Sequence, residues 1–223
     1  MDKQKLTDII DYTLLNPTVS KEDIKAFCQE TIDYGFKTVF VNPHYVPYAY
    51  ELLAPHNIKV GVPIGFSLGG ATTKTKVAET KEAIQNGAEE IDMLINLGAL
   101  KSQEYDVVRE DIAEVVNASE GLTTKVIIET ALLTEDEKVK AAKLIVEAGA
   151  DFVKTATGFN GGGATVEDVK LLRSVVGSDF GVKAAGGVRT YDDAIAIVEA
   201  GADRIGASGA IAIVTGGTSN ASY

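Results

Sequence analysis

The segments EAGADFVK (147–154) and EAGADRIG (199–206) share a pattern in which a helix-like stretch ends at a glycine and an extended apolar run follows. The same pattern occurs earlier as DYGFKTVF (33–40) and QNGAEEID (85–92). Glycine just beyond a helix end fits the left-handed backbone that caps helices. The four glycines are 52, 62 and 52 residues apart. Each interval fits two βα units of roughly 25 to 30 residues, so the sequence predicts a repeated βα array.

Capping signals at the predicted helix starts support this array. In a capping box, a hydroxyl lies three residues before a carboxylate, and both groups bond to the first turn of the helix. Four such pairs are present: Ser20 with Asp23, Thr134 with Glu137, Thr165 with Asp168, and Thr190 with Asp193. The helix predicted after Thr134 has charges on one face and an apolar set on the other, namely Val139, Ala142, Ile145 and Val146.

Short apolar runs between the predicted helices supply eight strands. They lie around residues 11–15, 38–42, 59–64, 90–95, 125–129, 152–155, 181–184 and 204–207. Runs that are apolar on both faces and alternate with helices indicate parallel strands covered by helices, and eight of them predict an α/β fold closed as a (β/α)8 TIM barrel. A doubly wound open sheet is the alternative, but no G-x-G-x-x-G follows the first strand. We expect a single barrel domain over 1–214 and a flexible tail over 215–223.

The charge balance excludes one class of partner. Lys and Arg contribute 21 charges and Asp and Glu 32, which gives a net charge of −11. Such an acidic chain is unsuited to neutralising nucleic-acid phosphates. No apolar run approaches the roughly 18 residues of a membrane span, and the start MDKQKLTDII has charges where a secretory signal needs an apolar core. We therefore expect a cytoplasmic protein without a nucleic-acid or membrane partner.

Cysteine and histidine usage gives little support to redox or zinc chemistry. The single cysteine, Cys28, has no partner for an intramolecular disulfide, and its helical setting beside Phe27 favours packing. His44 and His56 do not have a metal-ligand spacing, so a zinc site is not expected. A magnesium site of carboxylates alone stays open at this point, but we predict no metal ion.

Three charged residues interrupt the predicted apolar strands. They are Asp92 in EEIDMLIN, Lys154 in DFVKTATG and Lys183 in GVKAAGGVR. Reacting groups in a (β/α)8 barrel lie at the carboxyl ends of strands, so these residues are the first candidates for a site. Lys154 and Lys183 are 29 residues apart, about one βα unit, and hold similar places in consecutive strands. We expect both to project into the same barrel mouth.

A pair of neighbouring lysines has a chemical consequence. Two ammonium groups about 5 Å apart repel by roughly 3 kcal/mol at an effective dielectric near 20, which lowers the pKa of one partner by about two units. Burial acts in the same direction. The resulting free amine attacks carbonyl carbons, so the pair suits a Schiff-base enzyme. The alternative is that each lysine pairs with a carboxylate, Asp92 or Asp11, and only stabilises the barrel.

Two carboxylates are candidates for proton transfer. Asp92 can face the same cavity as the lysines and move protons directly or through a water, or it can serve as a salt-bridge partner of Lys183. Glu129, at the end of KVIIE, either points inward as a base or caps the loop that follows it.

Three glycine-rich loops follow the last three predicted strands: TATGFNGGGA (155–164), AAGGVRT (184–190) and GASGA (206–210). Glycine lets backbone N–H groups approach an anion closely, and the loops after strands seven and eight of such barrels commonly bind phosphate. The sequence therefore predicts a phosphorylated substrate. Arg189 either adds positive charge there or lies on the surface.

At these residues the sequence resembles the deoxyribose-phosphate aldolase family of class I aldolases. The matching stretches run nearly end to end: IDYTLLNP, FVNPHYV, IGFSLGG, GAEEIDMLINLGAL, KVIIET, GADFVKTATGF, VKAAGGVRT and RIGASG. The resemblance implies a lyase that cleaves 2-deoxy-D-ribose 5-phosphate reversibly into acetaldehyde and D-glyceraldehyde 3-phosphate, in deoxyribonucleotide and carbohydrate degradation. It implies no metal or organic cofactor, and a homo-oligomer, expected to be a dimer.

The resemblance also implies roles for individual residues. Lys154 matches the Schiff-base lysine, Lys183 the lysine that tunes its pKa, and Asp92 the proton-relay aspartate. The substrate-binding positions implied are Asp11, Thr13, Thr157, Gly158, Gly186, Gly187, Gly206 and Ser208, with Tyr223 in the tail.

The sequence departs from the family at three positions. Phe40 and Ala156 stand where Cys and Ser are common, and Gly209 stands where a second Ser is frequent, which puts phosphate affinity in question. Two other functions stay open: a sugar-phosphate isomerase with Glu129 or Asp92 as base, and a non-catalytic sugar-phosphate-binding barrel.

Overall fold

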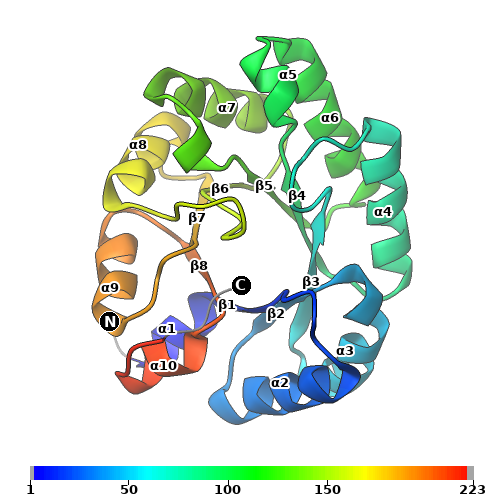
Figure 1. The fold of residues 1–223 in the computed structure, drawn as a ribbon, viewed down its shortest axis with the longest axis vertical. Coiled ribbons are helices and arrows are strands. Elements are labelled where there is room, and N and C mark those ends of the chain that lie inside the picture. Colours follow the sequence, from blue (N-terminus) through cyan, green and yellow to red (C-terminus); the bar gives the residue numbers. More distant parts are fainter. Residues whose placement is uncertain (1–2, 220–223) are drawn as a thin grey trace.

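The computed structural model describes residues 3–219, and in it eight parallel strands form a closed barrel surrounded by helices (Figure 1). The strands follow one another around the barrel in chain order, and the last pairs with the first. They are β1 Ile10–Leu14, β2 Thr38–Val41, β3 Lys59–Ile64, β4 Glu90–Leu94, β5 Thr123–Ile127, β6 Phe152–Lys154, β7 Gly181–Ala185 and β8 Arg204–Ala207. The predicted (β/α)8 TIM barrel is confirmed, and its closure excludes the open sheet.

Helices connect consecutive strands on the outside of the barrel (Figure 1). The α-helices are α1 Lys3–Ile9, α2 Lys21–Tyr34, α3 Val46–Leu53, α4 Thr73–Gln85, α5 Leu97–Lys101, α6 Tyr105–Ala118, α7 Glu135–Glu147, α8 Val166–Val176, α9 Tyr191–Glu199 and α10 Ala210–Thr215. Short 3₁₀ helices are η1 Pro43–Tyr45, η2 Ala54–His56 and η3 Thr130–Leu132.

The predicted helix caps form, with one difference. Complete capping boxes are present at the helix starts that follow Ser20, Thr134 and Thr190. At α8 the Thr165 hydroxyl accepts the Asp168 N–H, but the Asp168 carboxylate does not return to the cap. It accepts a 2.6 Å hydrogen bond from Lys138 of α7 instead, because a neighbouring cation competes for it.

The four marker glycines have the left-handed backbone that their position predicts. Their φ angles are 78° at Gly35, 103° at Gly87, 80° at Gly149 and 115° at Gly201. Each therefore ends a helix and turns the chain into the next strand.

The apolar face of α7 is rotated relative to the prediction. Ala142 and Ile145 are buried as expected, but Val146 is 43% exposed and Val139 is half-buried. Ala141 and Leu144 take their places, since the helix packs against β6 and between α6 and α8.

The two faces of the strands differ more than the prediction of apolar runs on both faces allows. One set of alternate residues packs against the helices in the main hydrophobic core, including Val39, Val62, Ile91, Met93, Val126, Val153, Val182 and Ile205. The other set points into the barrel and carries charges, for example Asp92, Lys125 and Lys183. Asp92 and Lys183 were expected to face this interior, whereas the charge on Lys125 was not.

Strand β5 ends two residues earlier than predicted. Glu129 has φ 54° and ψ 66°, a left-handed conformation that an extended strand cannot continue. The chain still bonds to its neighbour past this point, because Ile128 donates to the carbonyl of Lys154 and Thr130 to that of Thr155, each at 3.0 Å.

The first part of the expected flexible tail is held against the barrel. Thr218 forms an antiparallel bridge with Thr190, and the Ser219 N–H donates to the Arg189 carbonyl at 2.9 Å. Residues 220–223, and with them Tyr223, lie outside the described residues, so the flexibility of that end stays a prediction.

Gly61 of β3 is tightly fitted against Phe40, its Cα partner on β2. A Cβ at position 61 would lie 2.3 Å from the Phe40 ring. We expect Gly61→Ala to lower the free energy of unfolding by about 1 to 3 kcal/mol through overpacking, measured by urea denaturation. Gly70→Ala is the control, because a Cβ there meets nothing within 4 Å. Equal effects of the two substitutions would contradict the fit.

Candidate active site

Lys154 and Lys183 lie side by side near the carboxyl ends of β6 and β7. They are Cα partners in the pairing of these strands. Each ε-ammonium donates a 2.7 Å hydrogen bond to the same oxygen of Asp92, Oδ2, on β4. Because both nitrogens lie 2.7 Å from this one oxygen, the distance between them cannot exceed the sum of the two hydrogen-bond lengths. The structure brings the three candidate catalytic side chains together on one shared carboxylate.

The two lysines differ in their surroundings. Lys183 is fully buried and lies 2.5 Å from Oδ2 of Asp11, whereas Lys154 is 7% exposed. Burial lowers the pKa of Lys183 to about 8, against the opposing effect of Asp11 and Asp92. Lys154 is thus the member of the pair that a substrate in the barrel mouth can reach.

A third lysine, Lys125 of β5, belongs to the same cluster and was missed by sequence reasoning. It is fully buried and donates to Glu90 at 2.5 Å and to Asp92 at 3.1 Å. Arg204 of β8 binds Asp11 and also reaches Glu90 at 3.2 Å. The signal was present, since Lys125 is a charge at the start of the apolar run KVII, as Lys154 is at the end of its own run.

The barrel interior thus holds four cations against three carboxylates. The cations are Lys125, Lys154, Lys183 and Arg204, and the carboxylates are Asp11, Glu90 and Asp92. Although burial alone would raise the pKa of Asp92, the three ammonium groups hold it well below its ordinary value. Burial would lower the pKa of Lys125, but the three carboxylates outweigh it and raise that pKa. Loss of one proton makes the cluster neutral.

Glu129 does not face the lysines as a free base. Its Oε1 accepts the Thr157 N–H at 2.7 Å, so it fixes the backbone that follows β6. Its side chain is fully buried, and Oε2 has no hydrogen-bond partner in the structure. Of the two predicted roles, base or cap, the geometry favours a cap, although on the loop after β6.

The predicted anion-binding loops meet at glycines. Gly186 lies close to Gly158 and Gly163, since a Cβ on it would be 3.6 Å and 3.1 Å from their Cα atoms. Gly158, Gly186 and Gly187 all have positive φ. The N–H of Thr157 is used by Glu129 and its hydroxyl accepts the Phe159 N–H at 3.0 Å, so only the hydroxyl hydrogen is left to donate to a ligand.

Other candidate positions surround the cluster at different depths. Thr13 is buried and its hydroxyl donates to the Asp11 carbonyl at 3.0 Å. Gly206 makes room for a lysine stem, because a Cβ there would be 3.2 Å from Cε of Lys183. Arg189 is exposed.

Gly209 has a neighbour that sequence spacing did not indicate. A Cβ at Gly209 would lie 2.0 Å from Oγ of Ser219. The hydroxyl of Ser219 therefore occupies the space that a side chain at position 209 would fill. Ser208, the preceding residue, is half-buried.

Two loops meet over the barrel mouth. The Phe66 and Phe159 rings make an edge-to-face contact at 5.1 Å, and the Asn160 side chain donates to the Ser67 carbonyl at 2.6 Å. A cavity of about 520 Å³ lies beside this bridge, lined by Leu15, Pro17, Val19, Asn42, His44, Tyr45, Phe66, Ser67 and Phe159.

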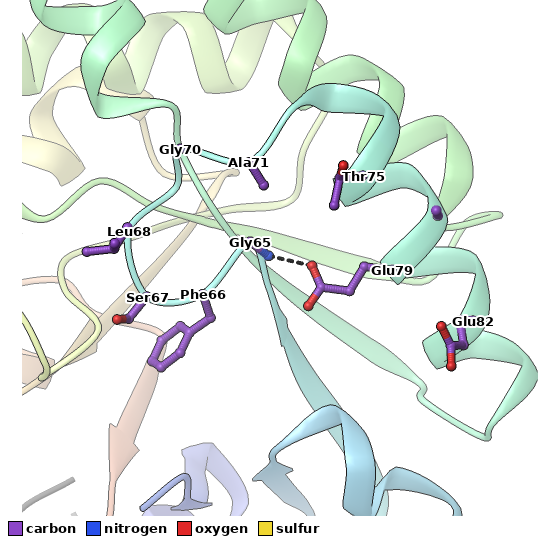
Figure 2. Close-up of a pocket in the computed structure, with 10 residues that line it drawn as sticks. Gly65, Phe66, Ser67, Leu68, Gly70, Ala71, Thr75, Glu79 and Glu82 are labelled. Carbon is purple, nitrogen blue, oxygen red and sulfur yellow. Dashed lines mark hydrogen bonds between the residues drawn. The ribbon is translucent and has the colours of Figure 1, made fainter. Parts of the chain in front are cut away.

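A larger cavity, of about 830 Å³, lies along the loop after β3 and one side of α4. Figure 2 shows Glu79 reaching from α4 toward this loop, where it accepts the Gly65 N–H at 2.8 Å. Burial raises the pKa of Glu79. The lining of this cavity includes none of the clustered lysines, so it is separate from the candidate active site.

Metal binding would need a group of suitable ligands, and thiol chemistry would need a reactive cysteine. Within residues 3–219, no three His, Cys, Asp or Glu side chains are grouped to bind a metal ion. Burial raises the pKa of the Cys28 thiol to about 12, as suits a packing residue. None of the helices described over the same range has the length and apolar character to span a membrane.

The family model for DeoC/LacD family aldolases matches residues 6–214. The chain belongs to the DeoC/LacD aldolase family. Among its relatives, deoxyribose-phosphate aldolase 2 of Oceanobacillus iheyensis is 64% identical over 223 residues, 100% of each chain. A deoxyribose-phosphate aldolase of Streptococcus sanguinis is 54% identical over 219 residues, 98% of this chain and 100% of the relative.

A solved structure agrees with this family. The tetrameric deoxyribose phosphate aldolase from Aeropyrum pernix matches with a TM-score of 0.90 and 33% identity, over 96% of this chain and 91% of that one. The barrel architecture is thus similar to that of a deoxyribose phosphate aldolase of known structure.

In this DeoC/LacD aldolase, we expect Lys183→Met and Lys125→Met to have opposite effects on stability. Because the folded pKa of Lys183 is about 8 and its ordinary value 10.5, the unfolded chain binds more protons between these pH values. Lys183 therefore costs roughly 3 kcal/mol below pH 8, a cost that disappears toward pH 10.5. Lys125→Met removes the 2.5 Å cation partner of the buried Glu90 carboxylate and costs about 3 to 5 kcal/mol.

Urea denaturation at pH 7 and pH 10 measures both effects. Lys183→Met is expected to gain stability relative to the unsubstituted protein at pH 7 and to lose most of this gain at pH 10. The charge balance described for the cluster is wrong if Lys183→Met destabilises the protein as much as Lys125→Met does. It is also wrong if the difference in free energy of unfolding between Lys183→Met and the unsubstituted protein does not vary with pH.

Proposed function

We propose that the protein is a class I aldolase that cleaves 2-deoxy-D-ribose 5-phosphate reversibly into acetaldehyde and D-glyceraldehyde 3-phosphate through a Schiff base on Lys154. The observation that carries this proposal is the pairing of Lys154 and Lys183 on the one carboxylate of Asp92 inside the closed barrel. An amine that loses its proton in such a site attacks aldehydes. Membership of the family and the activities in its relatives' names support the same reaction.

Lys154 is the nucleophile in the proposed reaction. Its neutral amine adds to C1 of the open-chain sugar, and loss of water gives an iminium. The C2–C3 bond then breaks, and its electron pair forms the C1–C2 double bond of an enamine. The C3 hydroxyl gives up its proton and C3 becomes the aldehyde carbon of the three-carbon product. Protonation of C2 and hydrolysis release acetaldehyde and restore the amine.

Asp92 and Lys183 support this chemistry in different ways. The charge on Lys183 disfavours a second ammonium on Lys154 and so promotes its free amine. Asp92 transfers protons through a water, and the surrounding cations keep its carboxylate ionised. When Lys154 becomes part of the neutral enamine, Asp92 loses one cation and becomes a better proton acceptor.

The glycine loops supply the phosphate site in this proposal. Gly158, Gly186 and Gly187 have positive φ and lie on the loops that follow β6 and β7. Backbone N–H groups on such loops bind anions without a side chain in the way. Ser208 and Ser219 add hydroxyls near Gly209, and Ser219 occupies the place of the side chain that Gly209 lacks.

No specific observation favours the two alternatives, a sugar-phosphate isomerase and a non-catalytic binding barrel. A carboxylate base in the isomerase would be Glu129 or Asp92, but Glu129 is bonded to the Thr157 backbone and Asp92 to three lysines. A binding barrel gives no reason for placing a partly accessible lysine beside a buried one.

The partners in this proposal are small phosphorylated sugars and aldehydes, with no metal or organic cofactor and no nucleic acid. The predicted cytoplasmic location and homodimer also stay proposals. The Aeropyrum pernix relative is described as tetrameric, so measurement of the mass in solution decides the oligomeric state.

The proposal predicts a covalent adduct. Acetaldehyde followed by borohydride is expected to add an ethyl group to Lys154, located by peptide mass spectrometry, and to abolish cleavage of 2-deoxyribose 5-phosphate. Lys154→Arg should give no adduct and should lower the cleavage rate by about a thousandfold or more, since the nucleophile is lost.

Lys138→Arg is the control, because Lys138 lies outside the barrel and pairs with Asp168. It should form the adduct and cleave the sugar normally. An adduct on another lysine, or turnover that borohydride leaves intact, would overturn the assignment of Lys154.

A further inference from the structure

Phe40 lies among the clustered lysines although it carries no charge. It is 2% exposed on β2. The ammonium nitrogen of Lys183 lies 3.9 Å from the centre of its ring, that of Lys125 4.8 Å and that of Lys154 5.7 Å. The absence of a side chain at Gly61 leaves room for the Phe40 ring, because a Cβ at position 61 would overlap the ring.

The Phe40 ring lies closer to the ammonium of Lys183 than to that of Lys154. The face of an aromatic ring attracts a cation within about 6 Å of its centre, and the attraction is strongest in a site without water. Lys183 lies well inside this distance, whereas Lys154 is near its limit. Phe40 therefore stabilises an ammonium on Lys183 more than one on Lys154.

The charged groups around the pair act in both directions, since Asp11 favours an ammonium on Lys183 and Lys125 opposes one. Asp92 is 2.7 Å from both nitrogens, so it favours neither. Asp11 lies 2.5 Å from Lys183 and favours an ammonium there. The remaining charged groups of the cluster are Glu90, Lys125 and Arg204, with the half-exposed Lys59 beside Glu90.

We propose that Phe40 is a positioning residue that stabilises the ammonium of Lys183 and thereby favours the free amine on the accessible Lys154. This inference rests on the proposed function. Complete burial works against the ammonium of Lys183, whose pKa falls to about 8. The ring at 3.9 Å and Asp11 offset part of that effect and stabilise the ammonium of the buried lysine.

The test replaces Phe40 by 3,4,5-trifluorophenylalanine, which keeps the ring and removes most of the negative charge on its face. Phe40→Leu serves as a second variant that lacks a ring. The same fluorinated residue in place of Phe36 is the control, because that buried ring packs against Tyr12 and not against the lysines. The readout is kcat/KM for cleavage of 2-deoxyribose 5-phosphate from pH 6 to pH 10.5.

We expect both Phe40 variants to lose about tenfold in kcat/KM near pH 7, because the proton then spends more time on Lys154. The loss should disappear at high pH, where both amines are neutral and no proton is left to misplace. The Phe36 control should follow the unsubstituted protein at every pH.

A defect of equal size at every pH, or no defect in the fluorinated variant, would overturn the role of Phe40. Borohydride trapping of the unsubstituted protein separates this outcome from failure of the proposed function. If Lys154 is trapped and the profiles of variant and unsubstituted protein stay parallel, only the inference on Phe40 fails. If Lys154 is not trapped, the Schiff-base mechanism itself fails.

Discussion

The sharing of Asp92 by Lys154 and Lys183 is the interaction on which the site depends. Two ammonium groups held this close repel one another, and only a carboxylate between them makes the arrangement stable. The barrel supplies it because β4, β6 and β7 point alternate side chains into one interior. Closure of β8 onto β1 adds Arg204 and Asp11, which complete a cluster with one cation in excess. That excess is what makes one proton easy to lose.

Much of the fold is readable from the sequence because each local signal has a local cause. Gly35 and Gly201 end helices through a backbone that other residues resist, and the capping boxes at Ser20 and Thr134 form as their spacing predicts. Such signals need only neighbouring residues. The end of β5 could not be predicted in this way, since it coincides with the left-handed backbone of Glu129, whose side chain binds the distant Thr157 N–H.

The site was predictable to the extent that charge inside an apolar run is unusual. Asp92, Lys154 and Lys183 were found by that criterion, and the same criterion applied to Lys125 would have found the third lysine. The pairings themselves were not predictable. Which lysine binds Asp11, and that Ser219 fills the space beside Gly209, depends on contacts between segments far apart in the chain. The rotation of α7 was missed for the same reason, because its neighbours decide which side is covered.

The close fit of Phe40 and Gly61 restricts how this barrel can change during evolution. A ring on β2 and a side chain on β3 compete for one volume, so neither position tolerates a larger residue while the other keeps its present identity. A small residue at position 40 would leave room for a side chain at position 61, which the present ring excludes. The two positions should therefore covary across the family, and directed evolution that randomises one of them alone will explore few folded sequences.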